Sequence, residues 1–159
     1  MLNEIKDDIA GTTPRLQVIA NYYSALILFE EGKYEAALKQ FQEVFNSIPP
    51  NHEPNYFYAV CLLKCRILSE AIDQFGIIKN WFSNTLNLIT VPGSQTYWPV
   101  QTVKAYYWSG VAYEQLGQKE KALKEYEEFL DIWKEADFNS PEIKDAKMRV
   151  AKLKRVTSK

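Results

Sequence analysis

The sequence predicts an all-α protein, a right-handed superhelical stack of about three helix-turn-helix units with a C-terminal capping helix. Two observations support this fold class. Apolar residues recur at the three- and four-residue spacing of amphipathic helices, and no stretch alternates convincingly at the period of two that a half-buried strand requires. In addition, one pattern of small and aromatic residues occurs three times along the chain, which indicates a repeat architecture.

The composition fits one domain over residues 1–159, because a chain of this length buries a core without disulfide or metal support. Aromatic residues make up 14% and there are only 6 glycines, which argues against disorder. The net charge is −1 with both signs spread along the chain, so no overall field favours nucleic acid or an anionic membrane. The N-terminal "MLNEIKDDIAG" contains no apolar run long enough for a signal peptide or a membrane span, so we expect a soluble, cytoplasmic chain.

The repeated pattern is clearest around three alanines. Ala37 and Ala71 are 34 residues apart, and Ala122 follows 51 residues later, which is one further period plus 17 inserted residues. The apolar positions that follow each alanine have the spacing of a helix stripe. A second helical pattern precedes each of these helices, with a small residue twelve positions before the alanine: Ala25, Ala59 and Gly110. In the first and third copies Gly32 and Gly117 separate the two helices, and glycine suits the positive φ of a helix C-terminus.

In chain order, we expect these elements: a short N-terminal helix at 1–12, a first repeat at 14–50, a second at 51–90, a loop at 91–98, a third repeat at 99–136, and a capping helix at 140–156. The N-terminal helix carries an apolar stripe of Leu2, Ile5 and Ile9 and looks like the end of a preceding unit. The inserted residues lengthen the second helix of repeat 2 to about Ile89, and the next helix begins near Pro99.

The capping helix begins with Ser140 as its N-cap and Pro141 at the first helical position. One stripe of apolar residues follows, and it suits a helix that closes an open-ended repeat stack: Ile143, Ala146, Val150 and Leu153. Four aromatic residues lie near the insertion, where they either cover the ends of the longer helices or form a separate aromatic binding surface: Trp81, Phe82, Tyr97 and Trp98.

A helix-turn-helix unit of about 34 residues with this order of positions resembles the tetratricopeptide repeat. The first copy carries the resemblance at Ala25, Leu28, Gly32, Tyr34, Ala37, Phe41 and Pro49. The second carries it at Ala59, Leu62, Ala71 and Phe75, and the third at Gly110, Tyr113, Gly117, Ala122 and Tyr126. The second copy departs from the family pattern at the turn, where Arg66 replaces glycine.

The resemblance implies a concave groove, lined by the first helix of each repeat, that binds a peptide or a partner helix. Carried over from the family, the groove positions are Tyr22, Leu26, Phe29, Tyr56, Val60, Leu63, Lys64, Lys104, Tyr107, Val111 and Glu114. The polar set with which some relatives grip the C-terminal carboxylate of heat-shock chaperones is missing. A tyrosine-lined, mostly apolar groove suits an amphipathic helix or an apolar extended segment. The alternative is that these rings pack between repeats.

Nothing in the sequence indicates catalysis, a metal or a cofactor. His52 is the only histidine, and we expect it on the surface of a polar loop without a triad partner. Cys61 and Cys65 are four residues apart and do not complete a zinc ligand set, so we expect free thiols. The glycines form neither of the usual phosphate-binding loops. We therefore expect no enzyme activity.

The C-terminal basic run is the one local imbalance of charge: Lys144, Lys147, Arg149, Lys152, Lys154, Arg155 and Lys159. It suits a solvated helix whose basic end complements the helix dipole, and a contact with nucleic acid or an acidic partner is the alternative. No aromatic residue interleaves these charges, so nucleic acid is not expected.

These features together predict a protein-protein interaction adaptor or scaffold. Two further hypotheses are a docking or sensor domain of a larger regulatory protein and a self-associating structural module, which would be a homo-oligomer.

Overall fold

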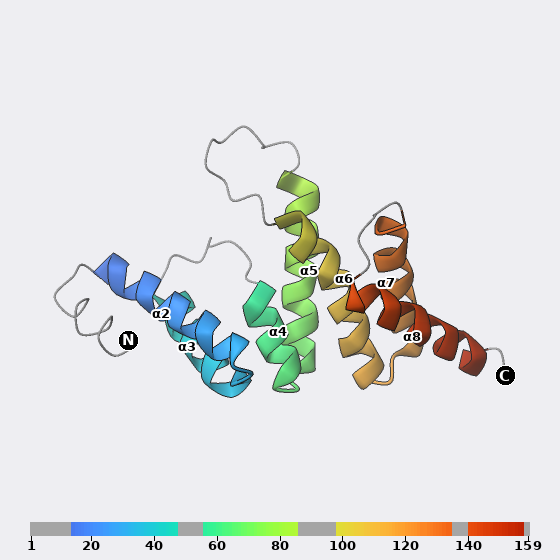
Figure 1. The fold of residues 1–159 in the computed structure, drawn as a ribbon, viewed down its shortest axis with the longest axis horizontal. Helices are drawn as coiled ribbons and strands as arrows, with labels where there is room; N and C mark the ends of the chain where they lie inside the picture. Colours follow the sequence, from blue (N-terminus) through green and yellow to red (C-terminus); the bar gives the residue numbers. More distant parts are fainter. Residues whose placement is uncertain (1–13, 48–55, 86–97, 135–139, 158–159) are drawn as a thin grey trace. The chain divides into compact units, whose positions relative to one another are not determined.

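The computed structural model describes residues 14–47, 56–85, 98–134 and 140–157. Over these residues it contains seven α-helices and no strand, which confirms the all-α prediction (Figure 1). The helices are α2 (Pro14–Glu30), α3 (Tyr34–Asn46), α4 (Tyr56–Lys64), α5 (Leu68–Thr85), α6 (Trp98–Gln115), α7 (Lys119–Ile132) and α8 (Pro141–Thr157). The predicted N-terminal helix, Pro49, His52 and the loop as far as Tyr97 lie outside the described residues.

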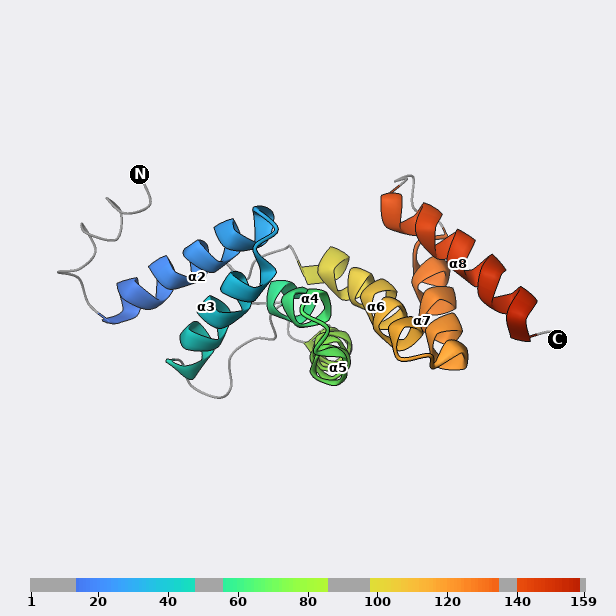
Figure 2. The same ribbon diagram turned by 90° about the horizontal axis from the view of Figure 1, so that it is seen from below.

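The described helices belong to two compact units, and the chain passes from one to the other between Arg66 and Ile67. In the first unit α3 packs against α2, and α4 packs against both. In the second unit α5 packs against α6, α6 against α7, and α7 against α8 (Figure 2). Helices that follow one another in the chain therefore pack side by side within each unit, as a helical repeat requires. The single domain and the right-handed superhelix remain predictions.

The predicted turns are present at both glycines. At Gly32 (φ 73°) the glycine N–H donates to the carbonyl of Phe29, and the next N–H donates to that of Leu28. At Gly117 (φ 74°) the glycine N–H donates to the carbonyl of Glu114, and the N–H of Gln118 donates to that of Tyr113. This pair of hydrogen bonds is the Schellman motif, which satisfies the last carbonyls of a helix. The glycines thus end α2 and α6 and start the return helices.

Arg66 takes the same conformation without being glycine. Its φ is 61°, and its N–H donates to the carbonyl of Leu63 at 3.0 Å, as in the two glycine turns. The left-handed region costs a residue with a Cβ roughly 1–2 kcal/mol. The second copy therefore departs from the family pattern in sequence while it keeps the turn conformation.

The repeated alanines and rings form the core. Ala37, Ala71 and Ala122 are fully buried, and so are the aromatic residues four positions later: Phe41, Phe75 and Tyr126. The small residues that precede these alanines by twelve positions are buried as well. The repeat period read from the sequence therefore corresponds to a repeated packing arrangement.

α6 and α7 approach each other closely at Gly110. A Cβ added there would lie 2.6 Å from Cε1 of Tyr126, a distance that side-chain carbons do not tolerate. The equivalent positions in the other copies, Ala25 and Ala59, are also without exposed surface. Glycine at 110 thus lets a large ring lie directly against the backbone of α6.

The helix that leads into the insertion is longer than its counterparts in the other repeats. α5 has 18 residues, against 13 for α3 and 14 for α7, so the second helix of repeat 2 is lengthened as predicted. The part of this prediction from residue 86 to Ile89 lies outside the described residues, as do the side chains of the four aromatic residues near the insertion. α6 begins at Trp98, one residue before the predicted start.

The start of α8 and the state of the thiols are as predicted. The Oγ of Ser140 accepts a bond from the N–H of Ile143 at 3.3 Å, which is the bond of an N-cap, and Pro141 occupies the first helical position. Cys61 and Cys65 are free cysteines, the first of them buried.

We predict that Gly110→Ala destabilises the fold although alanine is the better helix former. The added methyl must displace the Tyr126 ring, at a cost of about 1–3 kcal/mol. Gly76→Ala is the matched control, because Gly76 lies inside α5 with nothing within 4 Å of the added Cβ. It should stabilise the protein by about 0.5–1 kcal/mol. Urea unfolding followed by circular dichroism measures both, and equal effects of the same sign would refute the packing argument.

We also predict that Arg66→Gly stabilises the protein by about 0.5–1 kcal/mol, because glycine adopts a φ of 61° without strain. Arg66→Ala removes the same charge but keeps the Cβ, so it should bring no comparable gain. Thermal unfolding of the three proteins separates the two effects. If the alanine variant gained as much as the glycine variant, the stabilisation would come from charge and not from the backbone.

Candidate partner-binding surface

The predicted groove residues fall into three groups by exposure. Val60, Leu63, Tyr107 and Val111 are buried, and Lys64 is exposed. The other six are half-buried: Tyr22, Leu26, Phe29, Tyr56, Lys104 and Glu114. Seven of the eleven lie in the first unit, on α2 and α4, and four lie in the second unit, on α6. The two sets are therefore described separately.

Aromatic contacts join α2 and α4 in the first unit. The ring of Phe29 meets that of Phe57 edge-on, with centroids 5.2 Å apart, and Phe57 in turn contacts Tyr56 at 5.5 Å. Tyr22 packs edge-on against Phe41 of α3 at 5.9 Å. These edge-to-face pairs are favourable and hold each ring in place. The half-buried rings of α2 and α4 thus have a fixed backing of core residues.

The end of α4 adds a positive charge to this surface. The Nζ of Lys64 lies 5.7 Å from the centroid of the Tyr34 ring, a distance at which a cation is attracted to a ring face. Val60 and Leu63, from the same helix, belong to the core, with 2% of their surface exposed. Of the α4 positions, Tyr56 and Lys64 therefore reach the surface.

In the second unit, α8 engages three of the four predicted residues of α6. Lys104 forms an ion pair with Glu142 at 2.6 Å. The hydroxyl of Tyr107 donates to Asp145 at 2.8 Å. The guanidinium of Arg149 donates to Glu114 at 2.6 Å. The partners advance together along both helices, so α8 runs in the same direction as α6. The predicted binding positions of α6 thus hold a helix of the same chain.

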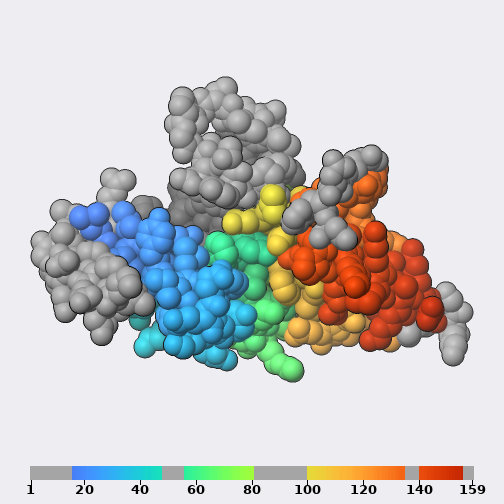
Figure 3. All heavy atoms as spheres, in the orientation of Figure 1, coloured from blue at the N-terminus to red at the C-terminus, as the bar shows by residue number. Residues whose placement is uncertain are grey.

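Arg149 is the centre of this network. It also donates to Asp145 on its own helix, and its guanidinium carbon lies 6.0 Å from the centroid of the Tyr126 ring. Tyr126 donates its hydroxyl to the carboxylate of Glu114 at 3.0 Å. Because α8 also packs against α7, the network joins α6, α7 and α8. Figure 3 shows α8, in red, on the surface of this unit.

The electrostatics follow from this geometry. Burial alone would raise the pKa of Asp145, but hydrogen bonds from Arg149 and Tyr107 hold the pKa of this carboxyl below its ordinary value. The pKa of Glu142 is lowered in the same way, since bonds from Lys104 and Ser140 outweigh burial. Burial and the bond to Asp145 raise the pKa of Tyr107. Both carboxylates of α8 therefore stay charged at neutral pH and hold the helix against α6.

Glu142, Asp145 and Arg149 could not be identified from the sequence as partners of the groove positions. The step of three from Glu142 to Asp145 matches the step from Lys104 to Tyr107, whereas Asp145 and Arg149 are four residues apart and Tyr107 and Glu114 are seven apart. Opposite charges at matched steps on two helices are a recognisable signal. The signal is ambiguous by itself, because many other acidic and basic residues in this chain have similar spacing.

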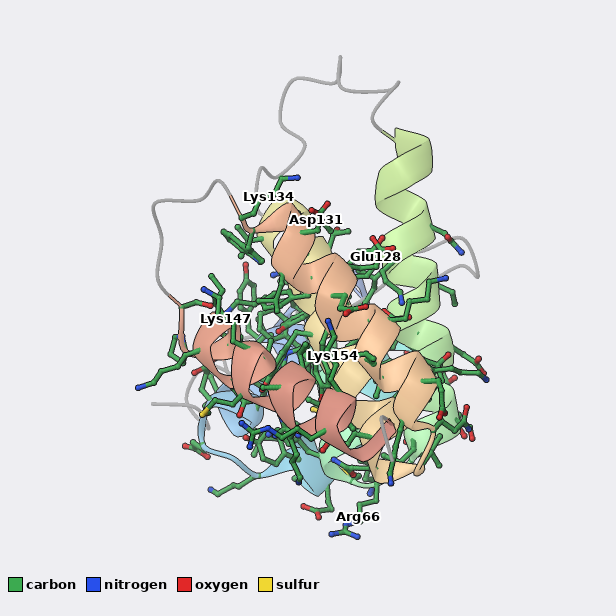
Figure 4. The ribbon with its side chains drawn as sticks, turned by 90° about the vertical axis from the view of Figure 1, so that its right-hand side faces the viewer. Arg66, Glu128, Asp131, Lys134, Lys147 and Lys154 are labelled. Atoms are coloured by element: carbon green, nitrogen blue, oxygen red, sulfur yellow. The ribbon has the colours of Figure 1, made fainter. Side chains whose placement is uncertain are left out.

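α8 also carries several exposed basic residues. Lys144, Lys147, Lys152 and Arg155 are exposed, and Lys154, labelled in Figure 4, pairs with Glu127 of α7 at 2.7 Å. Both acidic residues of α8 contact α6, and so does Arg149 among its basic residues. The sequence left two interpretations of the basic run open, and the exposure of these residues is compatible with both.

The described residues contain no group of three or more histidine, cysteine, aspartate or glutamate side chains placed to hold a metal ion. Burial raises the pKa of the Cys61 thiol to about 12, so this thiol is protonated at neutral pH and a poor nucleophile. Within the same residues, no helix combines the length and the apolar character needed to cross a membrane.

The paired helices, glycine turns and repeated buried alanines define the class, an α-helical repeat protein. Residues 18–77 match the family model described as anaphase-promoting complex, cyclosome, subunit 3. Residues 103–132, which cover most of α6 and all of α7, match the model of the tetratricopeptide repeat. Together these two matches support a protein of the tetratricopeptide repeat family. A search of curated proteins found no match. Domains of this family generally mediate protein–protein interactions.

We predict that acid weakens the docking of α8. Since the pKa values of Asp145 and Glu142 are lowered in the folded protein, their contribution is present above the unfolded values of about 4 and is lost as the pH falls through the folded values. Melting temperatures between about pH 6 and pH 2 should fall less steeply for Asp145→Asn combined with Glu142→Gln than for the original protein.

The control for this experiment neutralises two exposed carboxylates of α7, Glu120→Gln with Glu128→Gln. Its pH profile should follow that of the original protein. A control profile as flat as that of the α8 double variant would show that overall charge, and not the α6–α8 contact, sets the acid response.

Proposed function

We propose that this protein is a non-catalytic adaptor or scaffold module that binds a peptide or a partner helix through its first-helix surfaces. The binding surface in the first unit is the α2–α4 face, which we define as Tyr22, Leu26, Phe29 and Tyr56. Lys64 lies at the far end of α4 and supplies a positive charge. The proposal builds on the family membership, since domains of this kind generally bind other proteins.

The observation that carries the proposal is the contact between α6 and α8. Lys104, Tyr107 and Glu114 occupy in α6 the positions that Ile19, Tyr22 and Phe29 occupy in α2, 85 residues earlier. In α6 these positions bind a helix through side-chain contacts spread along one side of α6. The same backbone positions in the first unit therefore have the spacing needed to receive a helix.

The side chains indicate what kind of partner fits. The four residues of the α2–α4 face carry no charge, and three of them are aromatic. Aromatic rings with fixed backing contribute a large contact area at a small cost in conformational entropy. By contrast, the equivalent surface of α6 binds α8 through charges. We therefore expect an apolar or amphipathic partner segment in the first unit, with an acidic residue near Lys64.

We predict that Tyr56→Ala weakens partner binding by about 2 kcal/mol, as the loss of a central aromatic anchor does. The partner is first identified by placing a photo-crosslinking amino acid at position 56 and analysing the adduct by mass spectrometry. Its affinity for the original protein and for the variant is then measured by calorimetry. Crosslinking should require a folded protein. Circular dichroism checks that the protein carrying the photo-crosslinking residue is folded.

Tyr58→Ala is the matched control. Tyr58 lies on the same helix and is also half-buried, but its ring packs against Phe41 and Phe45 of α3. Loss of the Tyr58 ring should lower stability. The affinity of the folded variant for the partner should stay within about twofold of that of the original protein, a much smaller change than for Tyr56→Ala. If folded Tyr56→Ala protein bound as tightly as the original, the binding surface would lie elsewhere. A crosslink to a second copy would favour the self-associating module instead.

A further inference from the structure

α8 presents to solvent one side that carries four positive charges and no negative charge. Six exposed residues of this helix recur at steps of three, one, three, one and three, which is the spacing of a single helix face. We name this side the outer face of α8, and its residues are Lys144, Lys147, Met148, Ala151, Lys152 and Arg155. The two acidic residues of α8, Glu142 and Asp145, both contact α6 instead. The outer face therefore contains no carboxylate that could neutralise its cations.

The four cations of the outer face differ from the other basic residues of α8 in their contacts. Arg149 pairs with Glu114, and Lys154 pairs with Glu127. Within the part of the chain that the structure describes, the side chains of the four outer cations form no ion pair or hydrogen bond. They lie in two pairs, and the members of each pair are three residues apart, a spacing at which like charges on a helix repel. An acidic partner would remove this repulsion.

The helix dipole explains only the end of this charge pattern. Cations stabilise the last turn of a helix, and in α8 that turn contains Lys154 and Arg155. Lys144 follows the N-cap residue by four positions, near the positive end of the dipole, where a cation is unfavourable. Lys147 and Lys152 lie outside the last turn and gain little from the dipole. Three of the four outer cations therefore need another explanation.

An apolar centre separates the two pairs of cations. Met148 has 58% of its surface exposed, and Ala151 is exposed on the next turn of the same face. One pair of cations precedes this centre and the other follows it, so the whole face is about 17 Å long. Protein–protein interfaces combine an apolar centre with a polar rim, and methionine is enriched in them. The outer face of α8 has this arrangement on a small scale.

Contacts on the inner side of α8 hold the outer face in place. Ile143, Ala146 and Leu153 are buried along that side. Ion pairs join α8 to α6 near its beginning, through Glu142, and to α7 near its end, through Lys154. A partner would therefore meet side chains on a helix that is already ordered, which lowers the entropic cost of binding.

The side chains of the outer face favour a protein segment over other polyanions. Single-stranded nucleic acid is bound by aromatic side chains on which bases stack, and this face contains no aromatic residue. A helix that lies in a membrane interface needs a side rich in tryptophan, phenylalanine or leucine, whereas this face has only Met148 and Ala151. The phosphates of a DNA duplex would pair with the cations and leave Met148 without an apolar contact. An acidic amphipathic helix satisfies both the charges and the apolar centre.

We propose that the outer face of α8 docks an acidic amphipathic helix of a partner protein. Carboxylates of the partner pair with the four cations, and an apolar side chain between these carboxylates contacts Met148. About three turns of helix are enough to span the face. The inference is independent of the proposed function, because α8 belongs to the second unit and the α2–α4 face to the first.

A synthetic peptide and the whole chain are used to test the proposal. The patterned peptide is a helix with the spacing of the outer face, in which glutamate replaces each cation and leucine replaces Met148 and Ala151, with alanine and glutamine elsewhere. The control peptide has the same composition, but its glutamates are distributed around all sides of the helix. Fluorescence anisotropy measures the binding of both. The patterned peptide should bind about tenfold more tightly than the control, and its affinity should fall as the salt concentration rises.

Substitutions then assign the binding to the outer face. Lys147→Gln with Lys152→Gln should weaken binding of the patterned peptide about fivefold, because two ion pairs are lost. Lys119→Gln with Lys124→Gln removes the same charge from exposed positions of α7 and should change the affinity by less than about twofold. Met148→Gln keeps every charge and should weaken the peptide about threefold through loss of the apolar contact. Circular dichroism confirms that each variant is folded.

Three results would overturn the proposal. Equal affinity of the two peptides, including no binding of either, would show that the outer face does not recognise the patterned helix. An equal loss of affinity in the α7 and α8 double variants would show that overall charge sets the binding. A DNA duplex and vesicles of phosphatidylcholine with phosphatidylserine are measured in parallel. If either bound more tightly than the patterned peptide, the outer face would be a site for phosphate groups and not for a protein helix.

Discussion

The helices of this protein approach each other at positions where one of them carries almost no side chain, and the burial of the large rings depends on that approach. At Gly110 the distance is so small that a single methyl group would lie 2.6 Å from the Tyr126 ring. At the equivalent positions of the other two copies, Ala25 and Ala59 are fully buried. Where the Tyr126 ring lies against the backbone of α6 at Gly110, Ala122 of α7 is buried as well, and the α6–α7 pair is fixed.

Such helix pairs leave each first helix with one side that only a neighbouring helix can cover. α8 covers part of α6 through Glu142, Asp145 and Arg149, and burial of this network keeps its charges paired. α4 covers part of α2 through the contact of Phe57 with Phe29. The same backbone positions thus serve repeat packing in one place and, by our proposal, partner binding in another. The side chains at these positions, charged on α6 and aromatic on α2, decide which kind of helix each surface accepts.

Several features of the site could be predicted from the sequence because they depend on local chemistry. The glycines at 32 and 117 ended their helices as expected, and Ser140 with Pro141 started α8. Arg66 shows the limit of this approach, because it adopts the left-handed conformation although its side chain disfavours it. The pairing of α8 with α6 was not predicted, since charge spacing alone matches many possible partners in a chain with 20 acidic and 19 basic residues.

The sequence by itself determined the helices, their turns and the family, because apolar periodicity and backbone preference act within a few residues of each position. Only the tertiary structure decided which side of each first helix is accessible. Val60, Leu63 and Val111 have the periodicity of groove residues and are nevertheless buried, whereas Leu16 and Ile19, apolar residues of another first helix, are exposed. The physical reason is that a helix stripe is wider than one contact, so the neighbour that packs against it determines which part is buried.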